Sequence, residues 1–203
     1  MQTEFPEEVF RPLLEAYKKY NIPIYGERKN SGKGISQSMG ILSRRNYGIG
    51  ESRNNDSYPD ILREARKLAS IICPQIPYTT LAININYEAL THVDKNNIGP
   101  SCVVAFGDYT GGELVVKNLP YNIRHRPFIF NASDTPHSVA PVLSGTRFSI
   151  VFFRQRFPKW FYETHGYNLD YDGINALIPR RLEGQRASEV KVPDGEQQEQ
   201  EYE

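Results

Sequence analysis

The sequence predicts a mainly β fold with flanking helices. From Thr79 onward, apolar and polar residues alternate with a period of two, and turn signals rich in Gly, Pro and Asn separate the alternating stretches. Several short strands at regular spacing are typical of a β-sandwich or a closed jelly roll, and not of a sheet in which strands alternate with helices. Before Thr79 the apolar residues recur at helical spacing, so we expect the helices on the N-terminal side.

Two helices are predicted in the first 78 residues. The first covers residues 7–20, where apolar side chains follow a helical period and Pro12 marks the first turn. The second starts at residues 57–60, with Pro and Asp in its first turn, and ends before Pro74. We expect its apolar stripe to pack against a sheet; the stripe consists of Ile61, Leu62, Ala65, Leu68, Ala69 and Ile72.

The stretch between these helices, residues 26–55, is rich in Gly, Ser and Asn. We interpret it as a long loop with at most short strands. A loop of this length inside a compact domain often forms a lid or a binding arm.

Seven strands are predicted after the helices, over residues 80–87, 90–94, 101–106, 113–117, 127–131, 136–140 and 146–154. Residues 107–112, 118–120 and 144–145 are interpreted as turns between them. A short helix is expected over residues 157–165. Beyond residue 184 the chain is rich in Gln and Glu with almost no apolar side chains, which predicts disorder. We therefore expect N-terminal helices and a basic loop packed on the core (1–78), a jelly-roll core (79–183) and an acidic tail (184–203).

Length and charge limit the possible functions. The 203 residues suit one domain with a real core, and a formal net charge of zero argues weakly against a strong nucleic-acid binder. The charge is unevenly spread, because residues 26–53 hold six basic and two acidic residues, whereas residues 182–203 hold two basic and seven acidic ones. The basic segment suits phosphate contacts, and a solvated loop is an equal interpretation.

Two features bear on the compartment. The chain has only two cysteines, Cys73 and Cys102, which indicates a reducing environment and not a disulfide framework. Its N-terminal residues resemble no secretory signal, and no apolar run is long enough to span a membrane. We expect an intracellular protein, nuclear or cytoplasmic, without membrane association.

The first candidate site is His92-Val93-Asp94. Side chains two residues apart on a strand point to the same face, so this segment can supply two ligands to one metal ion. Two histidines and one carboxylate with open coordination positions form the ligand set of non-haem Fe(II) oxygenases. The pair alone is a weak signal, because a hydrogen-bonded surface pair beside a turn has the same sequence.

Three later residues complete the pattern. His137 lies in the strand-rich region, and Arg147 begins the strand RFSIVFF with Ser149 on the same face. An Fe(II) enzyme that activates O2 needs two electrons from a co-substrate, and 2-oxoglutarate supplies them by losing CO2. Its distal carboxylate needs a fixed cation, which Arg provides bidentately, and a neighbouring hydroxyl adds a donor. The remaining histidines, His125 and His165, are interpreted as surface residues.

With these residues in place, the chain resembles the 2-oxoglutarate/Fe(II)-dependent dioxygenase superfamily. Within it, the chain is most similar to the TET/JBP-like oxygenases, which oxidise the 5-methyl group of cytosine or thymine in DNA. The resemblance covers about residues 79–155, and its motifs lie at residues 84–86, 91–97, 99–101, 107–114, 136–137 and 145–151. It implies a double-stranded β-helix, the jelly roll of this superfamily, with Fe(II), 2-oxoglutarate and O2 as cofactor and co-substrates and ascorbate as a reductant.

The resemblance also implies roles for individual residues. Iron would be bound by His92, Asp94 and His137, and 2-oxoglutarate by Arg147 and Ser149. Asn86, a polar residue in an apolar strand, would contact the co-substrate or support the metal ligands.

Three further residues are candidates for substrate binding. Asn97 matches a family position that reaches the target pyrimidine, and a turn residue is an equal interpretation. Arg44 and Arg45 in the basic segment are candidates for contacts with DNA phosphates.

The function expected from this pattern is hydroxylation of a C–H bond, with the 5-methyl group of 5-methylcytosine or thymine in DNA as the substrate. The alternative is a protein or peptide hydroxylase of the prolyl or lysyl type, which uses the same iron site. Oxidation of a small molecule is the third possibility. A non-enzymatic interaction module with a vestigial metal site is the last one. The first 78 residues hold no recognised DNA-reading motif, and the sequence predicts no oligomeric state.

Overall fold

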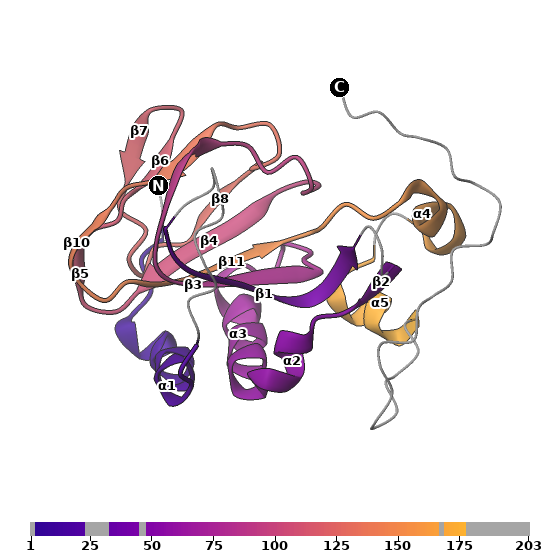
Figure 1. The fold of residues 1–203 in the computed structure, drawn as a ribbon, viewed down its shortest axis with the longest axis horizontal. Coiled ribbons are helices and arrows are strands. Elements are labelled where there is room, and N and C mark those ends of the chain that lie inside the picture. Colours follow the sequence, from indigo (N-terminus) through magenta and orange to yellow (C-terminus); the bar gives the residue numbers. More distant parts are fainter. Residues whose placement is uncertain (1–2, 23–32, 45–47, 167–168, 178–203) are drawn as a thin grey trace.

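A curled antiparallel sheet dominates the fold, and helices cover its outer face (Figure 1). The structure is a computed structural model that describes residues 3–22, 33–44, 48–166 and 169–177. Its helices are η1 (Glu7–Val9), α1 (Arg11–Lys19), α2 (Arg53–Ser57), α3 (Pro59–Ile72), α4 (Lys159–His165) and α5 (Tyr171–Leu177). Its strands are β1 (Lys33–Arg44), β2 (Gly48–Glu51), β3 (Thr80–His92), β4 (Ser101–Phe106), β5 (Tyr109–Gly111), β6 (Leu114–Val116), β7 (Leu119–Tyr121), β8 (Phe128–Phe130), β9 (His137–Val139), β10 (Val142–Gly145) and β11 (Phe148–Phe153).

The long strand β3 connects the two halves of the sheet. Its first part pairs with β1 on one side and with β11 on the other, and β11 continues the sheet to β4 and β8. Its last part pairs instead with β9, which continues to β6 and β7. A register shift between Ala89 and His92 marks the change of partner, and irregularities of this kind bend a strand. The predicted strands 80–87 and 90–94 are therefore one continuous strand.

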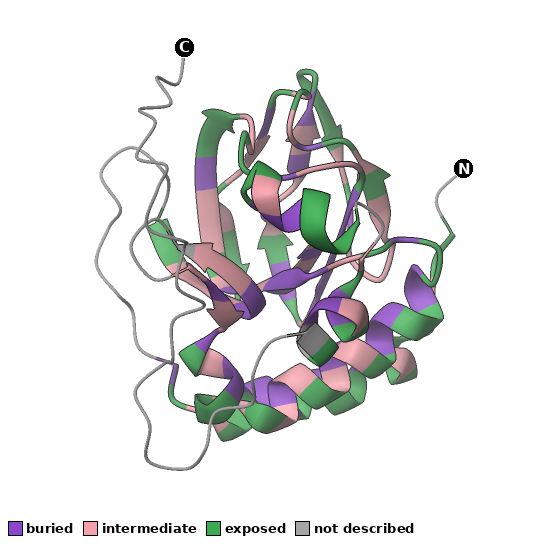
Figure 2. Cartoon of the chain, turned by 90° about the vertical axis from the view of Figure 1, so that its right-hand side faces the viewer, coloured by how far each residue is buried: buried purple, intermediate pink, exposed green. Residues whose placement is uncertain are grey.

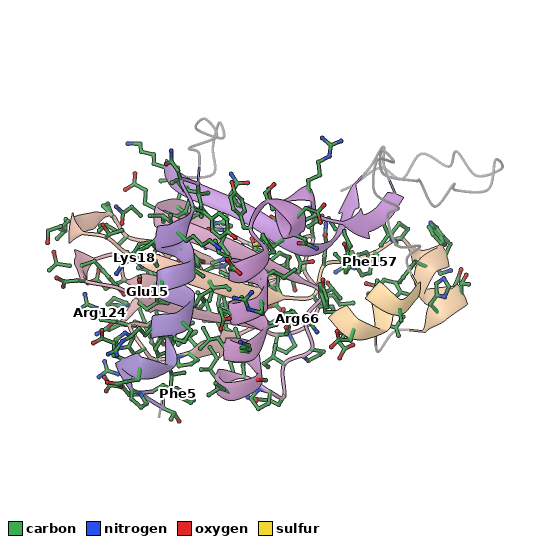
Figure 3. All side chains as sticks on the ribbon, turned by 90° about the horizontal axis from the view of Figure 1, so that it is seen from below. Phe5, Glu15, Lys18, Arg66, Arg124 and Phe157 are labelled. Atoms are coloured by element: carbon green, nitrogen blue, oxygen red, sulfur yellow. The ribbon has the colours of Figure 1, made fainter. Side chains whose placement is uncertain are left out.

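Two amphipathic helices, α1 and α3, cover the outer face of the sheet. Figure 3 shows them side by side across the strands, with Glu15 and Lys18 on the exposed side of α1. In Figure 2 the helices below the sheet carry their buried positions toward it. The buried cluster between helices and sheet contains Leu13, Tyr17, Ile61, Leu68, Ile72, Met39, Leu81, Ile83, Ile150 and Phe152. Both predicted N-terminal helices are confirmed, the first one beginning with the 3-10 turn η1.

The prediction of a long loop over residues 26–55 is wrong. Within it lie the twelve-residue strand β1, the strand β2 and the start of the short helix α2. One face of β1 carries the buried Met39 and Ile41, and the other carries Ser36, Ser38 and small glycines. The Gly and Ser residues of β1 have a low preference for strands. The alternation of apolar and polar residues in this segment was therefore not interpreted as a strand. Pairing with β3 and with β2 stabilises the strand in the fold.

Three short strands, β5, β7 and β10, lie where turns were predicted, and α5 was not predicted. Strands of three or four residues have too few residues to display a period, and only their pairing partners define them. The short helix expected over residues 157–165 is confirmed as α4. A second apolar cluster, which includes Phe157 (Figure 3), packs α4 and α5 against β1 and β2. The predicted disordered tail, residues 184–203, lies outside the described residues.

None of the helices in the described part of the chain has the length and apolar content that crossing a bilayer would require.

We expect Leu81→Ala to lower the free energy of unfolding by about 3 kcal/mol, because Leu81 is fully buried between β3 and the helices and its removal leaves a cavity. Leu143→Ala is the matched control: Leu143 also lies on a strand but is 78% exposed, so we expect a change within about 0.5 kcal/mol. Urea denaturation measures both. Equal losses for the two variants would contradict this description of the core.

Candidate active site

Three metal-binding side chains converge where β3 meets β9. Pairing of the two strands places His92, the last residue of β3, opposite His137, the first residue of β9. The Nε2 atom of His92 lies 3.5 Å from Oδ1 of Asp94, and Nε2 of His137 lies 3.8 Å from Oδ2 of the same carboxylate. One potential ligand atom from each residue lies within 4.8 Å of the others, which is close enough for all three to bind one ion.

Both imidazoles are oriented for metal binding by the backbone. Nδ1 of His92 lies 2.7 Å from the carbonyl oxygen of Leu90, and Nδ1 of His137 lies 2.9 Å from that of Thr135. A carbonyl can only accept a hydrogen bond, so each Nδ1 carries the proton and donates it. The lone pair of each neutral ring is then on Nε2, the atom that faces Asp94. A hydrogen bond of this kind commonly fixes the tautomer and orientation of metal-binding histidines.

Asp94 reaches the site in a different way from the one predicted. The sequence suggested that His92 and Asp94 share the face of a strand over residues 90–94, but β3 ends at His92. Asp94 lies in the turn that follows, where its N–H donates to the carbonyl of Ala132 and its own carbonyl accepts from the N–H of Asn97. The turn therefore brings the carboxylate to the imidazoles. His92 and Asp94 do lie close together, as predicted, but the turn and not the alternation of side chains along a strand is the reason.

A buried cation lies in the same cavity. Arg147 is only 2% exposed, and its Nη1 donates to Oγ of Ser149 at 2.9 Å. Its Nε has no hydrogen-bond partner, and in the described part of the chain no carboxylate lies within 4.0 Å of the guanidinium. Burial lowers the pKa of Arg147. Tyr109 and Glu113 offset this effect only in part. A buried cation without a direct ion-pair partner destabilises a fold, so an anionic ligand would complete this part of the cavity.

Three polar side chains stand in register next to Arg147. Ser36 on β1 pairs with Asn84 on β3, and Asn84 pairs with Ser149 on β11, so all three point into the cavity from adjacent strands. The cavity has a volume of about 220 Å³ and is also lined by the three potential metal ligands. Apolar side chains form the rest of its wall, among them Ala82, Val103, Leu114, Phe130, Val139 and Val151.

Comparison with known proteins gives a structural match only. No protein-family model and no curated protein sequence matches the chain. Among solved structures, the chain is similar to NgTET1 in complex with 5mC DNA, with a TM-score of 0.54 and 18% identity over 79% of this chain and 76% of that one. The fold is that of the 2-oxoglutarate/Fe(II) oxygenases. The predicted double-stranded β-helix is thereby confirmed.

Two further solved structures are similar to the chain at TM-scores below 0.5. One is a prolyl-4-hydroxylase from Pseudomonas putida, with a TM-score of 0.46 and 16% identity over 77% of this chain and 91% of that one. The other is a member of the 2OG-Fe(II) oxygenase family from Burkholderia pseudomallei, with a TM-score of 0.45 and 16% identity over 71% of this chain and 81% of that one.

The three potential ligands suit an Fe(II) ion chemically. Two neutral imidazoles and one carboxylate are the donor set that such an ion takes with coordination positions left open. A hydrogen bond to the carboxylate of Asp94 raises the pKa of His92, and a bound metal ion would replace the proton on Nε2. Burial lowers the pKa of His137, which keeps this ring neutral and available as a ligand.

Other predicted site residues lie around this centre. Asn86 has a left-handed backbone (φ 47°), and its Oδ1 accepts a hydrogen bond of 2.7 Å from the N–H of Arg147. It therefore holds the backbone of the buried cation, and its contact with a co-substrate stays a prediction. Asn97 is 5% exposed and lines the cavity. Arg44 is the last residue of β1 and Arg45 lies outside the described residues, so their phosphate contacts also stay predictions.

Sequence analysis missed part of the cavity wall. Ser36, Ser38 and Tyr87 line it, and none of the three was predicted as a site residue. Ser36 and Ser38 are two residues apart in a stretch that was interpreted as a loop. A period of two between these serines, out of phase with Met39 and Ile41, is the signal that could have identified them.

We expect His137→Ala to weaken binding of a divalent metal ion at least about tenfold, because it removes one of three potential ligands, and even loss of a group that supports a ligand costs about 10–100-fold. His165→Ala is the matched control, since His165 is exposed at the end of α4. Anaerobic calorimetric titration with Fe(II) measures both affinities. Unchanged affinity in His137→Ala would exclude this metal centre.

Proposed function

We propose that this chain is an Fe(II)- and 2-oxoglutarate-dependent dioxygenase that hydroxylates the 5-methyl group of 5-methylcytosine or thymine in DNA. The observation that carries the oxygenase part is the shared cavity. A potential His-Asp-His metal triad lines the same space of about 220 Å³ as a buried arginine that has no carboxylate within 4.0 Å among the described residues. A divalent cation and a dicarboxylate together supply what each half of this site needs.

The division of labour follows from the charges. His92, Asp94 and His137 would hold the metal ion, and Arg147 with Ser149 would hold the distal carboxylate of 2-oxoglutarate. Bound Fe(II), with 2-oxoglutarate and O2, supplies the oxidising chemistry. The residues of the chain bind and orient these groups.

The cavity wall is of mixed character. Apolar side chains, from Val103 on β4 to Val139 on β9, form part of it and would lower the local dielectric around the reacting groups. Asn84 and Ser36 add hydrogen-bonding groups on the side next to Ser149. A low-dielectric surrounding also strengthens the attraction between Arg147 and a carboxylate.

Three observations support DNA as the substrate. The fold is similar to that of NgTET1, whose structure contains 5mC DNA. Residues 26–53 carry a net positive charge, and their described part includes β1, which lines the cavity. Two exposed cations, Lys95 and Arg156, flank the turn that carries Asp94. Phosphate contacts from such groups would position a duplex, while the target base would have to be flipped into the cavity at a few kcal/mol.

The proposed activity is tested with the full chain, Fe(II), 2-oxoglutarate, O2 and ascorbate as the reductant. We expect formation of succinate, and a gain of one oxygen atom on oligonucleotides that contain 5-methylcytosine or thymine, measured by mass spectrometry. Arg147→Ala is the negative control. Oxidation of pooled Pro- and Lys-containing peptides with unmodified oligonucleotides would replace the DNA proposal by the peptide hydroxylase alternative. Absence of succinate with every substrate would refute the oxygenase proposal.

We expect Gly112→Ala to weaken 2-oxoglutarate binding by about tenfold, or about 1.4 kcal/mol. Gly112 has a φ of +68°, and a Cβ atom there would lie 2.6 Å from Cδ of Arg147, so the substitution displaces the cation. Gly50→Ala is the matched control, because a Cβ atom at Gly50 meets nothing within 4 Å. Titration of 2-oxoglutarate into the Mn(II)-loaded protein measures both. Equal affinities would contradict a role for Arg147 in holding the co-substrate.

A further inference from the structure

The turn after β3 holds the Asp94 carboxylate through Asn97. The Nδ2 of Asn97 donates to Oδ2 of Asp94 at 3.1 Å, and the backbone N–H of Asn97 donates to the carbonyl of Asp94 at 2.8 Å. Asn97 is 5% exposed, whereas the side chain of Asp94 is 36% exposed. A partly exposed carboxylate can rotate about two bonds, and a buried amide that donates to one of its oxygens restricts that rotation.

Asn97 is in turn held by the chain that follows β11. Asn97 and Gln155 form an isolated antiparallel bridge. Two backbone hydrogen bonds flank it, from Ile98 N–H to the carbonyl of Arg154 (2.9 Å) and from Arg156 N–H to the carbonyl of Asn96 (2.7 Å). The turn that carries Asp94 is therefore tied to the end of the central strand β11.

The side chain of Gln155 continues this connection to β1. Its Oε1 accepts from the backbone N–H of Ser43 at 3.0 Å, and its Nε2 donates to the carbonyl of Ser43 at 3.1 Å. One amide thus satisfies both backbone groups of a residue, as a neighbouring strand would. Ser43 pairs with Ile49 in the β1–β2 hairpin. Gln155 therefore joins the hairpin, which its side chain contacts, to the Asp94 turn, which its backbone bridges.

We propose that Asn97 is a positioning residue for the Asp94 carboxylate, and that Gln155 acts on the same carboxylate through Asn97 while anchoring the β1–β2 hairpin. This inference rests on the proposed metal site. It assigns Asn97 a role toward the metal ligand and not only toward a substrate base. It also makes the hairpin, which lies in the segment proposed for DNA phosphates, a structural neighbour of the metal centre.

The test uses Co(II) as the probe, because its visible spectrum reports how the ligands are arranged. We expect Asn97→Ala to weaken Co(II) binding by about tenfold, the lower end of the effect of removing a group that orients a metal ligand, and to change the visible bands. Asn122→Ala is the matched control, since the side chain of Asn122 also makes a hydrogen bond, accepting from the N–H of Arg124, but does not line the cavity. Urea denaturation of each variant separates loss of fold from loss of metal affinity.

A double-mutant cycle tests the connection through Gln155. We expect Gln155→Ala to weaken Co(II) binding by less than Asn97→Ala does. Because Gln155 acts through Asn97, the double variant should bind Co(II) no more weakly than Asn97→Ala alone. Independent, additive losses in the double variant would refute the connection.

A measurement on the unaltered chain keeps the inference falsifiable if a variant does not fold. We expect the side-chain amide protons of Asn97 to shift in the NMR spectrum on Zn(II) binding, while those of Asn122 stay in place. An unshifted Asn97 amide, or unchanged Co(II) affinity in a folded Asn97→Ala variant, overturns the assignment. If His137→Ala also binds Co(II) normally, the metal site itself has failed; if only Asn97→Ala does, the site stands and this inference has failed.

Discussion

The structure depends on β3, because this one strand pairs with neighbours in both halves of the sheet. The first part of this strand lies between β1 and β11 and carries Leu81 and Ile83 into the core under the helices. Its last part pairs with β9 and ends at His92. Because one strand belongs to both halves of the curled sheet, the helix-covered core and the candidate metal centre are built on the same backbone. Side chains on rigid paired strands hold their geometry more accurately than side chains on loops.

The cavity is lined by titratable and charged side chains, which are uncommon in the interior of a β fold. One part of it gathers two imidazoles and a carboxylate, and another holds a buried guanidinium with an unpartnered Nε. The imidazoles and the carboxylate together form a donor set for a cation, and among the described residues no carboxylate lies within 4.0 Å of the guanidinium. The backbone carbonyls behind His92 and His137, and the amide of Asn86 behind Arg147, keep these groups in position before any ligand arrives. Such preorganisation lowers the cost of ordering the site on binding.

Asn97 has two contacts that bear on the proposed function, one with Asp94 and one with the cavity. Its side-chain amide donates to Asp94, and it also lines the cavity that a flipped base would enter. A base that took the same amide N–H would release one oxygen of the Asp94 carboxylate. Substrate entry and the orientation of the metal ligand would then be coupled through one side chain, and Gln155 extends that coupling to the β1–β2 hairpin.

The sequence by itself predicted the chemistry proposed for this protein, because it holds residue types that bind a metal ion and a carboxylate in the order His92, Asp94, His137 and Arg147. It also predicted α1 and α3, whose amphipathic periods are strong local signals. Tertiary structure alone decided where those groups stand. Asp94 reaches the imidazoles through a turn and not through strand alternation, because β3 ends at His92 and the Ala132 carbonyl holds the next residues. The strand β1, with Ser36 and Ser38 on its cavity face, forms although its Ser and Gly residues are poor strand formers, since pairing with β3 supplies the stability that local preference lacks. Contacts between residues far apart in the chain set these positions.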